Sequence, residues 1–378
     1  MVPGKLTPWA LLAVALSSAA AGGCGGSAPR TRPGGDGSYL TALYPTLEQY
    51  GMISIQNGAV VPNDGVVPYE LNTPLFSDYA VKFRTVWMPP GTAAVYNDSD
   101  ALDFPVGTII TKSFGFRDDL RKPAPAVKWV ETRVFVRQET GWKGVSYGWN
   151  EAQTSATVNY GGGAVPVSWI DEAGATVRAD YLVPNGNQCT VCHSRRDPAS
   201  DTDVATLIGP KARNLNRNHL YETGEENQLA HLAAAGMLTG APSHPDSQAP
   251  RLPVWNDPST GSADQRARAY LEVNCAHCHS EQGFARTTGL YLGVGQTQWS
   301  SLGICKPPVA VGESTGGFLY DVVPGDPDHS ILTYRIASTE PATMMPQIGR
   351  SVTDQQGMQL LRDWVSGLKG TAPDCNGH

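Results

Sequence analysis

From residue 39 to about residue 183, apolar residues alternate with polar ones in short runs that Gly, Pro and Asn interrupt. In three of these runs the strand-favouring residues stand two positions apart: Val127 and Trp129; Thr132, Val134 and Val136; Val145, Tyr147 and Trp149. Alternation with a period of two is typical of strands that bury one face. This span therefore predicts an antiparallel β-sandwich or a related fold.

Helical spacing of apolar residues is found in the second half of the chain. Residues 223–226, 262–265 and 353–356 each match the capping-box pattern, in which Ser or Thr is followed three positions later by Glu or Gln. Apolar residues at helical spacing follow each of them, and Gly236 and Gly370 are expected to end the first and third of these helices. Three helices are therefore predicted.

The first 23 residues have the features of a leader. Lys5 precedes an apolar run over residues 9–21, which has the length of a signal-peptide core and is too short to span a bilayer. Small residues stand directly before Cys24, as a lipoprotein signal peptidase requires, so we expect Cys24 to carry lipid. The alternative is an ordinary secretory signal with an incidental cysteine. Either way export is predicted, and the Gly-, Ser- and Pro-rich residues 24–38 would form a flexible tether.

Size and charge narrow the class of protein further. About 340 residues follow the tether, which is more than one hydrophobic core usually serves, so two or three domains are expected. No later stretch is long and apolar enough to cross a membrane. The formal net charge is −7, and nothing in it indicates a nucleic-acid partner.

Cysteine usage supplies the strongest chemical signal. Four of the seven cysteines lie in two CxxC pairs, each followed directly by histidine: Cys189, Cys192 and His193 in CTVCH, and Cys275, Cys278 and His279 in CAHCH. In a c-type haem site two such thiols add to the vinyl groups of one porphyrin and the histidine binds the iron. Roughly 0.003 CxxCH strings are expected by chance in this composition, so the pair of motifs predicts two covalently bound c-type haems.

Three other uses of the CxxC pairs compete with haem attachment. They are a zinc site made from the four thiols, a pair of local disulfides, and a thioredoxin-like redox motif. None of them requires the following histidine, and export favours haem because c-type haem is attached outside the cytoplasm. His277, inside the second motif, is expected to be a spacer residue.

Two more cysteines, Cys305 and Cys375, lie outside the haem motifs. In an oxidising compartment we expect them to form a disulfide that ties a loop to the C-terminus. Two free thiols are the alternative.

Residues 255–378 resemble the small class I cytochrome c fold, in which a helix ending in CxxCH packs on a C-terminal helix that carries an aromatic residue, here Trp364. In that fold a methionine before a proline is the sixth iron ligand, and the resemblance implies Met345, which directly precedes Pro346. A thioether ligand favours the reduced iron. Met344 is the second candidate, and filling of the core is the alternative for both methionines.

The stretch over residues 322–336 resembles the segment that precedes the methionine loop in many bacterial cytochrome c domains. Arg335 in this stretch would bind a haem propionate, and a surface ion pair is the alternative. GPKARNLNR, at residues 209–217, resembles the Gly-Pro loop that packs on the proximal histidine of cytochrome c. The distal ligand of the first haem stays open among Met237, His219, His231, His244 or none.

From residue 39 to the C-terminus the chain resembles a proteobacterial family of lipoprotein two-haem c-type cytochromes. The matching stretches are YELNTPLFSDYAVKFR, FPVGTIITKSF, IGPKARNLNR, ARAYLEVNCAHCH, GICKPPVA and the segment from PGDPDHSIL to MMP. The resemblance implies electron transfer, but it indicates no particular reaction.

The expected fold class is α+β multidomain, with an antiparallel β-sandwich-like domain followed by mainly α cytochrome c-type haem domains. The expected divisions are a signal peptide at 1–23, a tether at 24–38, a β-rich domain at 39–185, a first haem module at 186–254 and a cytochrome c domain at 255–378. The expected location is the cell envelope, periplasmic or at the outer membrane, with a membrane contact through Cys24.

The expected function is electron transfer between redox partner proteins, without enzymatic activity. The alternative is a haem enzyme whose open first site acts on a small oxidant such as peroxide or a nitrogen oxide. FPVGTIITKSF followed by CxxCH also resembles β-fold haem proteins whose haem is linked to a lysine, and Lys112 would be the lysine concerned. The two-haem peroxidases and a purely structural β-domain lack support in the motifs.

Overall fold

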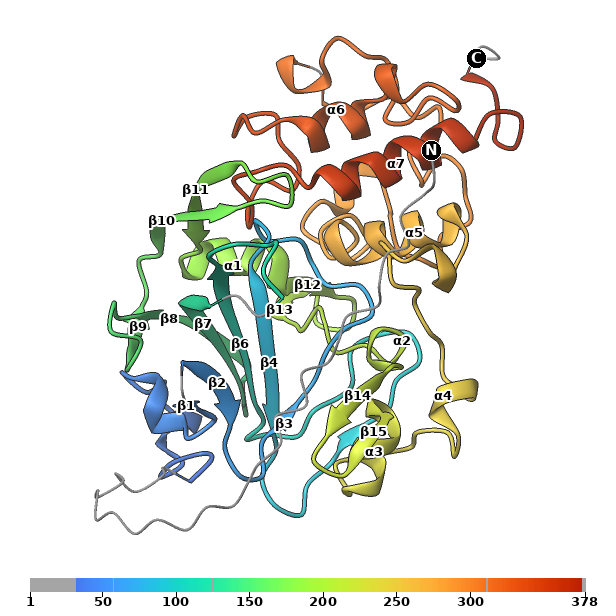
Figure 1. Ribbon diagram of the computed structural model, residues 1–378. Coiled ribbons are helices and arrows are strands. Elements are labelled where there is room, and N and C mark those ends of the chain that lie inside the picture. The colour runs from blue at the N-terminus through green and yellow to red at the C-terminus, as the bar shows by residue number, and fades with distance from the viewer. Residues whose placement is uncertain (1–31, 57, 124–125, 311, 376–378) are drawn as a thin grey trace. The chain divides into compact units, whose positions relative to one another are not determined.

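The computed structural model describes residues 32–56, 58–123, 126–310 and 312–375 (Figure 1). The predicted leader and its lipidation residue Cys24 lie outside these residues. The described residues form one compact unit. Within it, the segment predicted to be β-rich contacts the segments predicted to bind haem. The division at residues 185/186 and 254/255 stays a prediction. None of the described helices has the length and apolar character that crossing a bilayer requires.

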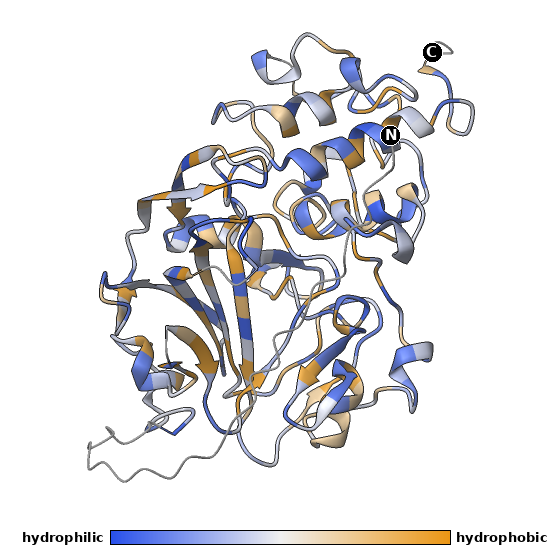
Figure 2. Cartoon of the chain, in the orientation of Figure 1, coloured by the Kyte–Doolittle hydropathy of each residue, from blue (hydrophilic) through white to orange (hydrophobic). Residues whose placement is uncertain are grey.

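A six-stranded sheet organises the first half of the chain, in the order β3-β4-β6-β7-β8-β9 with every pair antiparallel. Its strands are β3 (Val67–Pro68), β4 (Val81–Trp87), β6 (Ile109–Arg117), β7 (Val127–Gln138), β8 (Gly141–Trp149) and β9 (Ala156–Asn159). Figure 2 shows hydrophobic and hydrophilic residues alternating along β4. The predicted strand runs lie in β7 and β8, which confirms them as strands.

One face of this sheet carries a hydrophobic core. Val134 and Val136 of β7 are fully buried there and pack with Tyr147 of β8. The core is closed by the N-terminal segment, which holds η1 (Ser38–Leu40), η2 (Leu47–Tyr50), β1 (Ile53–Gln56) and β2 (Ala59–Pro62). Because side chains alternate along a strand, the residues between these valines point to the opposite face, where the chemistry described below is found.

The remaining strands form five small two-stranded sheets. They are β1-β2, β10-β11, β12-β13, β14-β15 and the parallel pair β5-β16. Their bounds are β5 (Ala94–Val95), β10 (Gly163–Ile170), β11 (Thr176–Val183), β12 (Ser194–Asp197), β13 (Thr202–Ala205), β14 (Asn218–Tyr221), β15 (Gly224–Asn227) and β16 (Leu238–Thr239).

The helices of the described residues are short and lie after residue 185. They are α1 (Gly186–His193), α2 (Ala212–Leu215), α3 (Gln228–Ala234), α4 (Pro245–Gln248), α5 (Ala263–Asn274), α6 (Ile331–Ala337) and α7 (Gln355–Gly367). Single 3-10 turns separate them at η3 (Pro258–Thr260), η4 (Arg286–Thr288), η5 (Glu313–Thr315) and η6 (Pro327–His329).

The predicted fold class is wrong. Helix, with the 3-10 turns included, makes up only 22% of the described residues, so the segment after residue 185 does not consist of mainly α cytochrome c-type domains. The N-terminal part is not a sandwich either, because its large sheet is covered by short hairpins and turns instead of a second sheet. Frequent Pro and Gly after residue 280 interrupt the chain, so helical spacing is sustained there only in α6 and α7.

Helices α5 and α7 pack together in the C-terminal core. The capping box that opens α5 at Ser262 is confirmed, with its hydroxyl accepting from the backbone N–H of Gln265. The start predicted for α7 is wrong by one residue, since Asp354 is its N-cap, and the helix ends at Gly367 instead of Gly370. Trp364 of α7 is buried and donates its indole N–H to Asp264 of α5 over 2.8 Å.

The helix predicted to open at residues 223–226 is also displaced. These residues form the turn and second strand of the β14-β15 hairpin, where the Thr223 hydroxyl donates to the Glu226 carboxylate. The helix that follows, α3, is capped by Asn227, whose side chain accepts from two backbone N–H groups. A Thr-x-x-Glu string also suits a tight turn, since the same short side-chain bond can form in either setting.

Candidate functional site

Each CxxCH motif is positioned by the end of a secondary-structure element. Asn185 caps α1 directly after β11 ends, so Cys189, Cys192 and His193 lie on one short helix. Cys275 is the C-cap of α5, and the backbone N–H groups of Cys278 and His279 both donate to its carbonyl. The two thiols of each motif therefore lie within about one turn of each other, as attachment to one porphyrin requires.

The two motifs meet in space. The Sγ of Cys278 donates to the carbonyl of Val191, on the first motif, over 3.3 Å. Cys192, His277 and Cys278 hold their ligand atoms within 4.8 Å of one another. Nothing in the spacing of the sequence predicted this junction, and His277, which we expected to be a spacer, is part of it.

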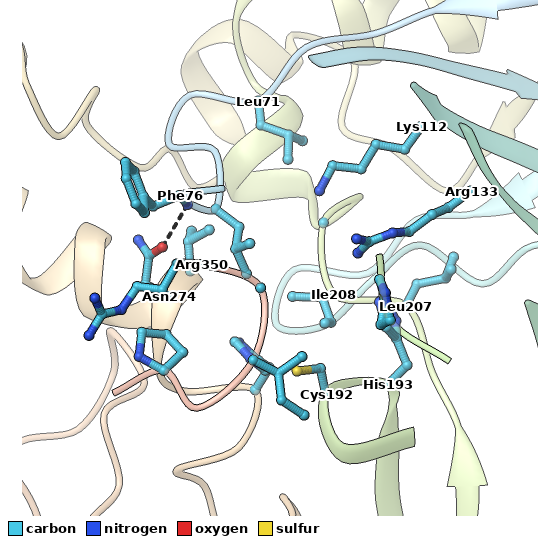
Figure 3. Close-up of a pocket in the computed structure, with 18 of the residues that line it drawn as sticks. Leu71, Phe76, Lys112, Arg133, Cys192, His193, Leu207, Ile208, Asn274 and Arg350 are labelled. Carbon is cyan, nitrogen blue, oxygen red and sulfur yellow. Dashed lines mark hydrogen bonds between the residues drawn. The ribbon is translucent and has the colours of Figure 1, made fainter. Parts of the chain in front are cut away.

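A pocket with a cavity volume of about 150 Å³ lies beside the first motif (Figure 3). Cys189, Cys192 and His193 line it together with apolar side chains from several separate stretches of the chain, among them Leu71, Ile110, Phe135, Leu207 and Ile208. The backbone N–H of Phe76 donates a hydrogen bond to the Asn274 side chain over 2.8 Å, shown dashed in Figure 3. This bond connects the wall of the pocket to the end of α5.

His193 is arranged as a metal ligand is. Its Nδ1 lies 3.0 Å from the carbonyl oxygen of Thr206, and the Phe135 ring packs on the imidazole at 4.6 Å between centroids. Burial lowers the pKa of His193 to about 4, so the ring is neutral at physiological pH. A neutral ring that donates from Nδ1 leaves the Nε2 lone pair free for a metal ion.

A second pocket, with a cavity volume of about 370 Å³, lies beside the second motif. Cys275, Cys278 and His279 line it with apolar residues that include Leu292 and Leu302. Burial lowers the pKa of His279 to about 4, and its Nδ1 is buried without a hydrogen-bond partner. Burial also raises the pKa of the Cys275 thiol to about 12. A neutral histidine and two thiols beside an apolar cavity are the donor set that a covalent haem needs.

Met345 lines both pockets, whereas Met344 is buried and lines neither. The Met345 backbone is held on both sides, since its N–H donates to the carbonyl of Arg335 and its carbonyl accepts from Arg350. Arg335 lines the second pocket and donates its Nε to the carbonyl of Thr343 over 2.8 Å. Its predicted binding of a propionate stays a prediction.

The four residues considered as distal ligands of the first haem lie away from both pockets. His231 stacks on Tyr221 at 3.6 Å between centroids and pairs with Glu226, and His219 contacts the same tyrosine. His244 is the N-cap of α4. Met237 packs against the core that contains Leu229 and Leu232. Each therefore has a structural role in this fold.

Three cations line the first pocket, of which only Lys112 was connected with a haem site from the sequence. Arg84, Lys112 and Arg133 come from three neighbouring strands of the large sheet. Burial, followed by the neighbouring cations Arg84, Lys82 and Arg133, lowers the pKa of Lys112 well below its ordinary value. The basic residues are visible in the sequence, but they do not by themselves indicate a pocket. Cations at alternate strand positions also occur on solvent-exposed faces.

Cys305 and Cys375 form a disulfide with an S–S length of 2.10 Å and a Cα–Cα distance of 5.0 Å. Among the described cysteines, the four that remain free are those of the two CxxCH motifs. The chain thus leaves its motif thiols available for a ligand.

The cluster of Cys192, His277 and Cys278 offers a different use for two of the motif thiols. Three such groups can hold a metal ion such as zinc, which usually takes four ligands. A site made from all four motif thiols is not formed, since Cys189 and Cys275 lie outside the cluster. A metal ion held here would occupy one thiol of each motif and would therefore exclude complete haem attachment at both.

Searches of protein-family models, curated proteins and solved structures found no match to this chain.

Proposed function

We propose that this protein binds two c-type haems and carries electrons between redox partners. One haem would be bound by Cys189, Cys192 and His193, and the other by Cys275, Cys278 and His279. The observation that carries the proposal is the meeting of the two motifs at the Cys192–Cys278 junction. Electron transfer between cofactors slows steeply with separation, and thiols in contact would bring the two porphyrin edges close together.

The donor sets and cavities support haem at both positions. Each motif opens onto a mostly apolar pocket, and each proximal histidine is neutral at physiological pH. When bound, the haems would supply one-electron redox chemistry at iron. The role of the protein is then to hold the thioether bonds, orient the imidazoles and exclude water from the irons.

Met345 is the proposed sixth ligand of the second haem. It stands in the wall shared by the two pockets, and its backbone is fixed by Arg335 and Arg350. A thioether ligand would raise the reduction potential of the haem that it binds. The two haems would then differ in potential, which would set a direction for electron flow.

The proposed setting is the cell envelope, with the chain exported and anchored through lipid on Cys24. This follows from the leader pattern before Cys24 and from the chemistry of c-type haem, which is attached outside the cytoplasm. Its partners would be redox proteins of the same compartment.

A second candidate function is a haem enzyme with an open first site. It is favoured by the placement of Met237, His219, His231 and His244, none of which lines the pocket beside His193. An iron without a protein ligand on its distal face is able to bind a small oxidant such as peroxide or a nitrogen oxide. Lys112, which lines that pocket, would then face the reacting molecule.

One set of spectra tests both candidates. Haem content is first determined by pyridine haemochrome, and two haems per chain are expected. Ferric and ferrous spectra with and without carbon monoxide then report ligation. Electron transfer is supported by a methionine–iron charge-transfer band with no rapid binding of carbon monoxide, whereas rapid binding at one haem supports the enzyme. A chain that holds zinc and no haem would refute the proposal.

A further inference from the structure

Three cationic side chains stand side by side on one face of the large sheet. The Cα register pairs Arg84 of β4 with Lys112 of β6, and Lys112 with Arg133 of β7. Residues paired across antiparallel strands point to the same face, so the three charges form a row, which we call the cationic row. Like charges directly opposite each other destabilise a sheet, so this arrangement requires a compensating group.

The protein itself compensates only one end of the row. Glu131 pairs with Arg133 over 2.7 Å, and the same carboxylate also accepts from Ser146 and Tyr181. Among the described residues, no carboxylate lies within ion-pair distance of Arg84 or Lys112. The ammonium of Lys112 has instead a weak cation–π contact with the Phe114 ring at 4.7 Å.

Arg84 gives the second, independent sign of a missing ligand. Its relative solvent exposure is 5%, and its Nη2 is buried with no hydrogen-bond partner. A buried guanidinium with an unused donor is costly unless an acceptor binds it. All three members of the cationic row line the first pocket, and Figure 3 shows Lys112 and Arg133 reaching into it.

We propose that Arg84, Lys112 and Arg133 form an anion site that binds a carboxylate or a small oxyanion in the pocket beside His193. Guanidinium groups match the two oxygens of such anions, and the ammonium adds a point charge between them. The anion has two chemical sources, which are the propionates of the first haem or a diffusible anion. The haem source rests on the proposed function, whereas the diffusible source does not.

The test is carried out on the full-length purified protein with sodium nitrite as the probe. Nitrite is titrated by calorimetry, and the reduction potential is measured when haem is present. The variants are Lys112→Met in the cationic row and Lys128→Met as the control, because Lys128 is exposed on β7 of the same sheet. A third variant, Lys112→Arg, keeps the positive charge. If Lys112→Met does not fold, Arg84→Gln takes its place in the comparison.

If the anion is diffusible, wild type binds one nitrite, and Lys112→Met weakens binding at least tenfold. Lys128→Met and Lys112→Arg then stay within about threefold, which is less than 1 kcal/mol. If propionates fill the site, Lys112→Met leaves any nitrite binding unchanged but lowers the reduction potential of the first haem, because a nearby positive charge that favours the reduced state has been removed. Lys128→Met leaves that potential unchanged.

The proposal is overturned if Lys112→Met and Lys128→Met have the same nitrite affinity and the same haem potential. A chain that contains no haem would refute the proposed function separately. In that case the calorimetric titration of the haem-free protein alone decides the anion site, with saturable binding supporting it and no binding overturning it.

Discussion

The two CxxCH segments carry the same chemistry but are completed in different ways. The second pocket draws nearly all of its lining from residues 274–348, so its motif, its Met345 loop and its apolar wall belong to one stretch of chain. The first pocket is built from the sheet, from the loop at residues 207–210 and from the ends of α5 and the methionine loop. A motif that is completed locally can be interpreted from sequence, whereas one completed by distant strands cannot.

The largest expected effect is the loss of one haem when the cysteines of a single motif are replaced. Cys189→Ala with Cys192→Ala should reduce the haem content from two per chain to one, and Cys275→Ala with Cys278→Ala should do the same for the other haem. Pyridine haemochrome and intact mass measure the loss. A matched Cys305→Ser and Cys375→Ser variant removes two cysteines outside the motifs and should keep both haems. Unchanged haem content in either motif variant would contradict haem attachment there.

Met345→Ala should change the second haem far more than the first. If Met345 is the sixth ligand, as proposed, loss of its thioether should remove the methionine–iron charge-transfer band and lower the potential of that haem. Potentiometric titration followed in the visible spectrum measures both. Met344→Ala is the control, since Met344 is buried but lines neither pocket. If the band disappears with Met344→Ala and persists with Met345→Ala, the assignment of the ligand is wrong.

Glu272 links the helix of the second motif to the loop that borders the first pocket. Burial works against its charge, but Lys211 at 2.8 Å and Arg213 at 3.6 Å outweigh this and lower the pKa of Glu272 below 4.5. Glu272→Gln should reduce the free energy of unfolding by about 1.5–3 kcal/mol, as for other hydrogen bonds to charged groups. Denaturant titration measures the loss.

The pH dependence of this link has a defined sign. Because the folded-state pKa of Glu272 is lowered, its stabilising contribution is complete above pH 4.5 and is lost as the pH falls through the folded-state value. The difference in stability between wild type and Glu272→Gln should therefore shrink in acid. Glu281→Gln, at an exposed position near the second motif, should leave stability unchanged at both pH values. A difference that grows in acid would contradict the assignment.

The smallest effect concerns the packing behind the second motif. A Cβ at Gly357 of α7 would lie 2.4 Å from the Tyr270 ring of α5, so Gly357→Ala should destabilise the fold by about 1–3 kcal/mol. Gly367→Ala, in the same helix with no atom within 4 Å of the added Cβ, is the control and should be neutral or slightly stabilising. Thermal unfolding separates the two. Equal effects would show that the helices do not pack this closely.

The error in the fold class has a physical origin. Capping boxes and apolar spacing indicate helix locally, and at Ser262 the prediction was confirmed. At residues 223–226 the same pattern belongs to a hairpin, because a Thr–Glu side-chain bond also stabilises a tight turn. Between such short elements the chain runs as turns and loops, which local patterns describe poorly.

Spacing within a few residues was enough to locate the two CxxCH motifs and to predict strands in β7 and β8 and the helices α5 and α7. The meeting of Cys192 with Cys278, and the shared position of Arg84, Lys112 and Arg133 on one wall of a pocket, can be seen only in the folded structure. These arrangements depend on strand register and on contacts between segments far apart in the chain. No local pattern of residue types encodes them, because they are set by how the whole chain buries its apolar surface.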